Sequence, residues 1–195
     1  MKKIEVPSLI IKDKLKYHKQ YKEKTLDLIN STKDGDFKNN INNAYDNISK
    51  LDWNLSKNFE RPWVKLIGNF IYDQLNNFAI EMGYQKIKLT ELWYQQYQKE
   101  AIHNWHIHSG NYTEVYYLEF DKNSPTTEFL YPNNLNNCFT IDVEEGDIII
   151  FPSYFIHRSQ KNFIDKIKTI ISFNLEFENL QNEFTKDKEI SVRFY

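Results

Sequence analysis

Three histidines carry the clearest chemistry in this sequence. His106 and His108 stand two residues apart in the run WHIH (105–108), and His157 follows later, directly after the run PSYFI (152–156). Side chains two residues apart leave the same face of an extended strand. Imidazole nitrogens are common ligands of divalent metals, and a third histidine can complete a triad. The spacing therefore predicts a metal site of His106, His108 and His157, although a His-x-His pair can also arise by chance or make ordinary hydrogen bonds.

The two other histidines, His18 and His103, are not expected in this site. His103 lies three residues before His106, and an odd spacing points two side chains to opposite faces of a strand. We therefore expect His103 to face away from the metal.

The elements that must position these histidines are strands, because the residues after Gly83 alternate with a period of two. Short aromatic and β-branched runs are separated by Gly, Asn, Asp and Pro, which favour turns. The expected strands are 87–97, 113–120, 127–131, 139–143, 147–151 and 167–177, with 188–195 as an additional candidate. Regularly spaced strands of this kind indicate a mainly β protein, an antiparallel barrel or sandwich of jelly-roll type.

A long amphipathic helix is expected to brace this sheet. Pro62 suits the first turn of a helix and Gly83 suits the position just after its end. Between them one apolar stripe recurs at helical spacing; it comprises Trp63, Leu66, Ile67, Phe70, Ile71, Leu75, Phe78, Ala79 and Met82.

The N-terminal segment is expected to support the barrel. A short strand or edge segment within 1–11 precedes a mostly solvated helix at 13–30, and loops with one helical turn near 41–48 follow. The predicted organisation is a single domain, 1–195, with a support at 1–83 and a jelly-roll catalytic core at 84–195.

Composition narrows the functional classes. The formal net charge of −2 over 195 residues and the pI near 6.2 give no electrostatic reason to expect a nucleic-acid or membrane partner. Cys138 is the only cysteine, which excludes an intramolecular disulfide and fits a reducing cytoplasm. No apolar run is long enough for a signal peptide or a membrane span. We expect a soluble, cytoplasmic protein, and its richness in Asn, Lys and Ile suggests an AT-rich source such as a phage. The sequence gives no signal for an oligomeric state.

A longer pattern surrounds the histidines. His106-x-His108 is followed by VYYL (115–118), by EGDIIIFPSY (145–154) ahead of His157, and by Lys168 leading into ISFN (171–174). Over residues 87–177 this pattern resembles the 2-oxoglutarate/Fe(II)-dependent oxygenase superfamily, with its small phage and bacterial members nearest and prolyl hydroxylases more distant. The resemblance implies a double-stranded β-helix, a cupin-like jelly roll, that binds Fe(II) and the co-substrate 2-oxoglutarate.

By this resemblance His106 would be the first iron ligand and His157 the distal one. His108 stands where the superfamily usually has Asp, or more rarely Glu, so the third ligand departs from the common pattern. A neutral imidazole in place of a carboxylate leaves the metal more positive, which favours the dianionic co-substrate, and zinc or another metal could compete for the site. His108 would also fill the space that halogenases of the superfamily leave for halide, so halogenation is not expected.

The resemblance also implies a pocket for the co-substrate. Lys168 occupies the position of an Arg that meets the far carboxylate of 2-oxoglutarate, and Lys supplies the charge without the bidentate fork. Tyr117 matches a tyrosine whose hydroxyl meets the same carboxylate in prolyl hydroxylases. Alternation turns every second residue of 168–174 into the barrel. The expected co-substrate pocket is Lys168, Tyr117, Ser172 and Gln95, and the expected substrate pocket is Trp105, Tyr97, Tyr154 and Asn174.

The predicted function is a non-haem Fe(II) dioxygenase that couples oxidative decarboxylation of 2-oxoglutarate to hydroxylation, with dioxygen as the oxidant. A small molecule or a protein side chain is the expected substrate, and the fold does not choose between them. Two alternatives stay open. One is a three-histidine cupin-like metalloenzyme that does not use 2-oxoglutarate, which His108 favours. The other is a non-catalytic barrel module, such as a part of a phage particle.

Overall fold

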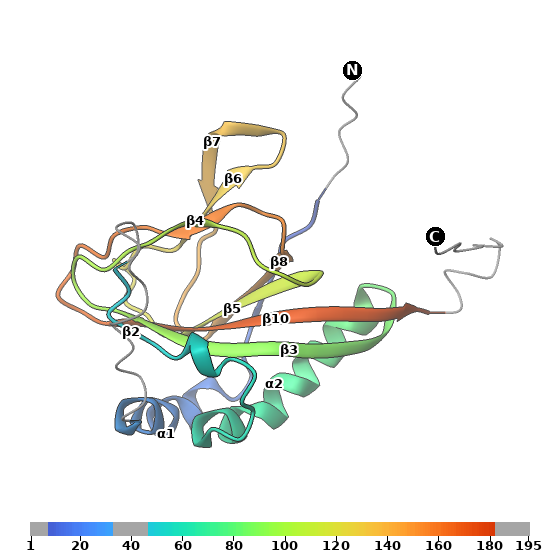
Figure 1. The fold of residues 1–195 in the computed structure, drawn as a ribbon, viewed down its shortest axis with the longest axis horizontal. Coiled ribbons are helices and arrows are strands. Elements are labelled where there is room, and N and C mark those ends of the chain that lie inside the picture. The colour runs from blue at the N-terminus through green and yellow to red at the C-terminus, as the bar shows by residue number, and fades with distance from the viewer. Residues whose placement is uncertain (1–7, 33–46, 182–195) are drawn as a thin grey trace.

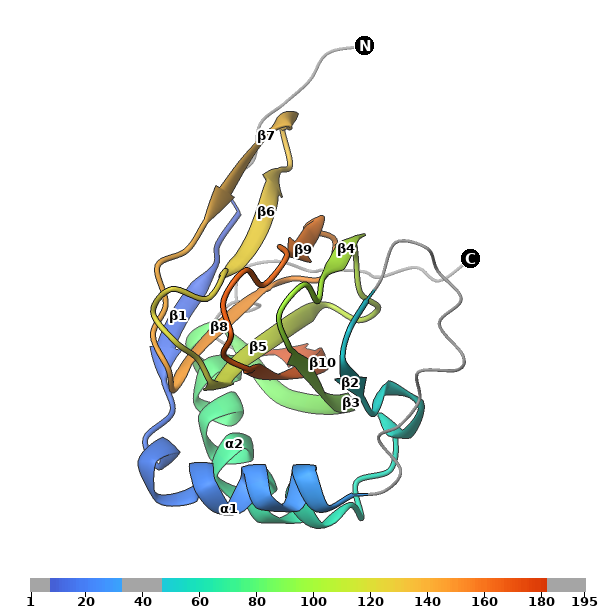
Figure 2. The ribbon, with the colours of Figure 1, turned by 90° about the vertical axis from the view of Figure 1, so that its left-hand side faces the viewer.

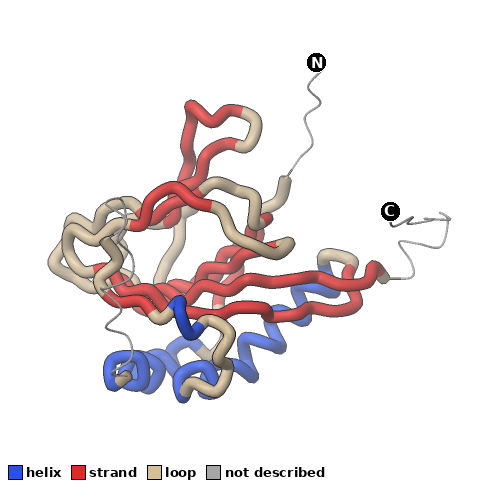
Figure 3. Tube along the Cα trace, viewed as in Figure 1, coloured by secondary structure: helices blue, strands red, loops and turns tan. Residues whose placement is uncertain are grey.

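The computed structural model describes residues 8–32 and 47–181, which form two β-sheets, two α-helices and one 3-10 helix (Figure 1). Both α-helices cover one face of the larger sheet, and the smaller sheet lies across its other face (Figures 1 and 2). Figure 3 shows the same division, with helices confined to one side of the molecule. The expected strand at 188–195 and most of the expected helical turn at 41–48 lie outside the described residues.

The two sheets are antiparallel throughout and together form the predicted jelly roll. The larger sheet has the order β1 (Ile11–Lys14), β8 (Asp147–Pro152), β5 (Tyr112–Glu119), β10 (Lys168–Leu180), β3 (Tyr84–Tyr97), β2 (Lys50–Leu51). The smaller sheet has the order β4 (His103–His106), β9 (His157–Ser159), β6 (Thr127–Tyr131), β7 (Asn134–Thr140). The strand expected at 139–143 thus begins and ends earlier, because a tight hairpin pairs Tyr131 with Asn134.

Helix α2 (Pro62–Glu81) is the predicted brace. It ends just before Gly83, whose φ of 84° is in the left-handed region that glycine adopts easily. Its buried stripe, including Ile67, Ile71 and Leu75, joins the apolar cluster on the helix-covered face of the larger sheet. Burial of each such side chain contributes about 1.5–3 kcal/mol. Helix α1 (His18–Ser31) packs against α2 and buries fewer apolar side chains.

A buried ion pair fixes the entry to α2. Asp52 accepts hydrogen bonds from the Arg61 guanidinium, from Trp63 Nε1 at 3.2 Å and from the Tyr94 backbone N–H at 2.8 Å. The 3-10 helix (Trp53–Leu55) between Asp52 and Arg61 brings the two residues together. This network ties the start of the helix to β3.

The N-terminal segment does more than support the sheet from outside, since β1 and β2 add strands to its two edges. The division of the chain into a support at 1–83 and a catalytic core at 84–195 stays a prediction. In the part of the chain that the structure describes, no helix is long and apolar enough to span a bilayer.

Alternation along β10 follows the prediction. Ile171, Phe173 and Leu175 belong to the cluster shared with the helices. Lys168, Ser172 and Asn174 are equally buried on the other face, which looks toward the smaller sheet. We call the helix-covered face of the larger sheet its outer face, and the face toward the smaller sheet its inner face.

Candidate metal centre and adjoining pocket

The structure brings the three predicted metal ligands together at the junction of β4 and β9. His106 ends β4 and is paired directly with His157, which begins β9. His108 follows in the loop after β4, where its backbone N–H donates to the Ser153 carbonyl oxygen over 3.1 Å. The ligand nitrogens of the three imidazoles all lie within 4.8 Å of one another. Such a group is compact enough to hold one metal ion.

Backbone carbonyls set the tautomers of two of these rings. Nδ1 of His106 lies 2.6 Å from the carbonyl oxygen of Asn104, and Nδ1 of His157 lies 2.9 Å from that of Phe155. A carbonyl oxygen only accepts, so each Nδ1 carries the proton and each Nε2 keeps its lone pair. Metal-bound histidines are typically oriented by such bonds.

Burial keeps the imidazoles of His108 and His157 neutral. It lowers the pKa of His108 to about 3 and that of His157 well below its ordinary value, and the neighbouring histidines lower both further. The Nε2 atoms of His108 and His157 face each other at 3.2 Å. Imidazole nitrogens that converge in this way form a donor set suited to a divalent cation.

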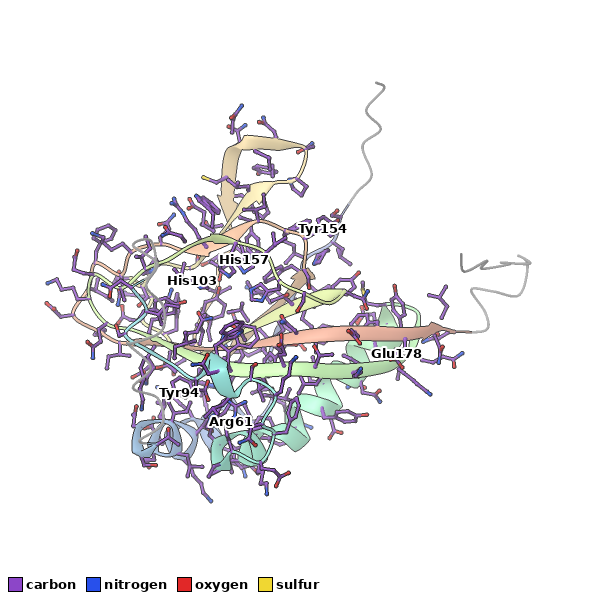
Figure 4. The ribbon with its side chains drawn as sticks, in the orientation of Figure 1. Arg61, Tyr94, His103, Tyr154, His157 and Glu178 are labelled. Atoms are coloured by element: carbon purple, nitrogen blue, oxygen red, sulfur yellow. The ribbon has the colours of Figure 1, made fainter. Side chains whose placement is uncertain are left out.

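His103 also lies at this cluster, so the prediction that it faces away was wrong. Its ring stacks on that of His106 with centroids 3.8 Å apart and an interplanar angle of 20°. The pairing of β4 with β9 shifts register between His103 and His106, and such an irregularity breaks the alternation of a regular strand. His103 and His157 both lie between the two sheets, away from the helices (Figure 4). Three histidines within residues 103–108 were the available sequence signal.

Lys168 lies fully buried at the start of β10. Its Nζ donates to Ser159 Oγ and, over 3.0 Å, to the Pro125 carbonyl oxygen, and it lies 4.5 Å from the centroid of the Tyr97 ring. Among the residues that the structure describes, no carboxylate forms an ion pair with it. Burial lowers the pKa of Lys168 to about 7, because the charge has no compensating anion.

The other expected pocket residues are neighbours of Lys168 across the inner face. Tyr97 pairs with Lys168, while Gln95 and Tyr117 both pair with Ile170. Tyr97 donates its hydroxyl proton to Gln95. The Tyr117 hydroxyl lies 2.8 Å from Thr127 Oγ1, and burial raises its pKa to about 12. Tyr97, Gln95, Tyr117 and Lys168 are therefore buried neighbours on the inner face, and we call this set of four residues the lysine pocket.

Asn174 and Ser172 lie further along the inner face, toward His108. Asn174 Nδ2 donates over 3.3 Å to Oγ of Ser109, the residue that follows His108 in the chain. Ser172 pairs with Trp93, whose ring stacks on that of His108 with centroids 5.5 Å apart. Strand β10 thus links the lysine pocket to the histidine cluster.

Trp105 and Tyr154 have no contact with the histidine cluster in the interactions that the structure gives them. The Trp105 ring covers the guanidinium of Arg158, 4.3 Å from its centroid. Tyr154 is 59% exposed, and its hydroxyl lies 2.8 Å from Ser8 Oγ. Sequence reasoning gave no role to Ser159 or Thr127, which contact Lys168 and Tyr117. Ser159 follows His157 by two residues, so alternation was a signal that could have found it.

Comparison with known proteins agrees with this geometry. Residues 91–174 match a family described as "Putative 2OG-Fe(II) oxygenase". Among curated proteins, none matches this chain.

Solved structures share the fold at low sequence identity. HygX from Streptomyces hygroscopicus, with nickel and 2-oxoglutarate bound, has a TM-score of 0.64 at 8% identity, over 86% of this chain and 82% of HygX. A prolyl-4-hydroxylase from Pseudomonas putida has a TM-score of 0.61 at 10% identity, over 88% and 94%. A prolyl hydroxylase from Trichoplax adhaerens, in complex with a peptide fragment of hypoxia inducible factor, has a TM-score of 0.61 at 16% identity, over 92% and 87%. The fold is a double-stranded β-helix, and the resemblance of this chain to the 2-oxoglutarate/Fe(II)-dependent oxygenase superfamily is confirmed.

Proposed function

We propose that this chain is an Fe(II)- and 2-oxoglutarate-dependent dioxygenase that hydroxylates its substrate. In this proposal His106, His108 and His157 hold the metal, and the lysine pocket holds the far carboxylate of 2-oxoglutarate. The observation that carries it is one buried face with converging imidazoles at one end and, among the described residues, a lysine without a carboxylate partner at the other.

The histidine cluster fits a metal by its chemistry. His106 and His157 both direct an Nε2 lone pair away from the carbonyl that binds Nδ1. The Nε2 atoms of His108 and His157 lie 3.2 Å apart, so both can reach one cation when neither carries a proton. Three neutral ligands leave the charge of Fe(II) intact, which favours an anionic co-substrate.

The lysine pocket fits the far carboxylate of 2-oxoglutarate. A buried ammonium group without a counter-ion is costly, and a bound carboxylate compensates it with a charge-assisted hydrogen bond. The Tyr117 hydroxyl, kept protonated by its raised pKa, supplies a second donor beside it. Lys168 and Tyr117 thus select a dianion over a neutral molecule.

Each group of residues has its own task in the proposed reaction. When bound, Fe(II) and 2-oxoglutarate supply the oxidative chemistry by which dioxygen hydroxylates a C–H bond. The histidines fix the metal, and Lys168 and Tyr117 fix the co-substrate's orientation. The apolar side chains between the two sheets, including Phe129, Phe151 and Ile170, exclude water around them.

The proposed substrate is a small molecule or a protein side chain. A solved relative in fold binds a peptide fragment, which supports the second class as a candidate for screening. The proposed setting is the cytoplasm, including that of a phage-infected host, and the proposed catalytic core is residues 84–195 with 1–83 as its support.

The test is anaerobic titration of the metal-free protein with Fe(II) and then 2-oxoglutarate, recorded as visible absorption. We expect the weak metal-to-ligand charge-transfer band of the chelate, and we expect it to be lost in His106→Ala and His157→Ala. His108→Asp should keep the band, because Asp is the residue that the superfamily usually has there. No band in the wild-type protein, with Fe(II) bound, would contradict the use of 2-oxoglutarate.

A second candidate is a three-histidine metalloenzyme that does not use 2-oxoglutarate. The presence of His108 where a carboxylate is usual favours it. It predicts Fe(II) binding that neither 2-oxoglutarate nor Lys168→Met alters. A protein that binds no metal would instead be a non-catalytic barrel module.

A further inference from the structure

His103 lies in the histidine cluster without a hydrogen-bond partner for its ring. Among the residues that the structure describes, none forms a hydrogen bond with either ring nitrogen of His103, whereas His106 and His157 each donate from Nδ1 to a backbone carbonyl oxygen. The His103 ring stacks on that of His106, with the centroids 3.8 Å apart. Neutral or charged, a histidine ring carries at least one N–H. His103 therefore has a donor beside a metal ligand that no described residue takes up.

Strand pairing places His103 beside the lysine pocket as well. His103 is the direct cross-strand partner of Ser159. Directly paired residues of antiparallel strands project from the same face of a sheet, with their Cβ atoms about 5 Å apart. Ser159 Oγ in turn accepts a hydrogen bond from Lys168 Nζ. His103 thus adjoins His106 directly and Lys168 through Ser159.

A row of three polar residues crosses the smaller sheet at this level. His103 of β4 pairs with Ser159 of β9, which pairs with Thr127 of β6. Ser159 binds Lys168, and Thr127 Oγ1 lies 2.8 Å from the Tyr117 hydroxyl. Two members of the row therefore contact the groups that are proposed to hold the far carboxylate of 2-oxoglutarate. His103, the member that touches the histidine cluster, has no hydrogen-bond partner among the described residues of the larger sheet.

We propose that His103 binds the co-substrate by donating a ring N–H to an oxygen at the keto-acid end of 2-oxoglutarate. A molecule that is held by Lys168 at one end and by the metal at the other passes His103, because His103 adjoins both groups. The keto-acid end is the nearer one, since the ring stacks on a metal ligand. An anionic acceptor strengthens such a bond. This inference rests on the proposed function, because it needs a co-substrate that spans the two groups.

The first test separates the N–H of His103 from its ring stacking. His103→Phe keeps an aromatic ring against His106 and removes the donor, whereas His103→Gln removes the ring and keeps a side-chain N–H. With Zn(II) bound, we expect the affinity for 2-oxoglutarate, measured by isothermal titration, to fall about 10- to 100-fold in His103→Phe, the range for one hydrogen bond to a charged group. His103→Gln should lose less. A wild-type affinity in His103→Phe, or a greater loss in His103→Gln than in His103→Phe, would overturn the inference.

The second test asks whether His103 acts on the metal instead. We expect His103→Phe to bind Co(II) as tightly as the wild-type protein, followed by visible ligand-field absorption, because His103 is not one of the three converging ligands. A loss of Co(II) affinity as large as the loss of 2-oxoglutarate affinity would assign His103 to the metal and overturn the inference. His18→Phe is the matched control. It removes a buried histidine of the outer face, whose Nδ1 lies 2.7 Å from the Tyr116 hydroxyl, and should change neither affinity.

The third test observes the ring N–H of His103 in the wild-type protein with Zn(II) bound, by ¹H–¹⁵N NMR, so it does not depend on how the variants fold. We expect this N–H to exchange with solvent before 2-oxoglutarate is added, and to exchange slowly and shift downfield afterwards, as a hydrogen-bonded donor does. An unchanged His103 signal in protein saturated with 2-oxoglutarate would overturn the inference and leave the proposed function intact. A wild-type protein that binds the metal but no 2-oxoglutarate would instead overturn the proposed function, and the inference with it.

Discussion

The two faces of the larger sheet are buried to the same extent and hold opposite chemistry. On the outer face of β10, Phe173 and Leu175 are fully buried against the helices. On the inner face, Lys168 is 1% exposed and Asn174 3%. The outer side chains need only shape and apolar contact, whereas each inner one needs a specific partner. Burial alone therefore does not distinguish the stabilising face from the candidate site; the partners of the buried groups do.

One residue breaks the pattern on the outer face. Glu114 pairs with Phe173, so it points toward the helices. It is completely buried, and neither of its carboxylate oxygens has a hydrogen-bond partner among the described residues. Burial, together with the charge of Asp13, raises the pKa of Glu114 well above its ordinary value. It is a polar group in the stabilising layer, remote from the site.

The largest expected effect is on stability, and it should distinguish Phe173 from its neighbour Ser172, because the two side chains lie on opposite faces of β10. We expect Phe173→Ala to lower the free energy of unfolding by about 3–5 kcal/mol, because it opens a cavity in the outer layer. Ser172→Ala should cost less than about 1.5 kcal/mol. Urea denaturation measures both. Equal losses of stability in the two variants would contradict the assignment of the stabilising role to the outer face.

Lys168→Met should separate binding from stability. We expect the affinity for 2-oxoglutarate to fall about 100-fold or more, equivalent to about 3 kcal/mol for a charge-assisted bond in a buried site. The fold should be as stable or more so, since a costly buried charge is removed. Isothermal titration with Fe(II) present measures the affinity, and Lys166→Met, an exposed lysine paired with Asp121, is the control.

Glu114→Met tests the exception on the outer face. The folded-state pKa is raised, so the folded protein holds this proton more tightly than the unfolded chain. The stability so contributed is complete below the unfolded value near 4.5 and is lost as the pH rises through the folded pKa. We expect Glu114→Met to be more stable at neutral pH by about 1–3 kcal/mol. The difference should shrink as the pH falls toward 4.5, as measured by urea denaturation at several pH values, and a constant difference would show that Glu114 is not protonated on folding.

The smallest expected effects, on co-substrate affinity and on stability, come from removing the hydroxyl groups of the neighbouring tyrosines of β5. Tyr117 faces the inner side beside Thr127, and Tyr116 faces the outer side with its hydroxyl 2.7 Å from His18 Nδ1. Removing one hydroxyl costs about 1 kcal/mol. We expect Tyr117→Phe to weaken 2-oxoglutarate binding about 5- to 10-fold and Tyr116→Phe to lower only the stability. The reverse result would mean that the two faces are assigned to the wrong tyrosines.

The periodic features of this protein could be predicted from its sequence alone. A period of two predicted most of the strands and the faces of β10, a period near 3.6 predicted α2, and the spacing of His106, His108 and His157 indicated the histidine cluster. These follow from local geometry, since a side chain's direction within a regular element depends only on its position.

Which residues become partners across different elements could be seen only in the folded chain. His103 joins the cluster because β4 shifts register against β9, and the irregularity has no local signature. Glu91, Asn174 and Ser109 meet because β3, β10 and the loop after β4 are adjacent in space, although they are far apart in the chain. Such contacts depend on pairing and register, which arise from the packing of the whole chain and are not encoded in any short stretch of it.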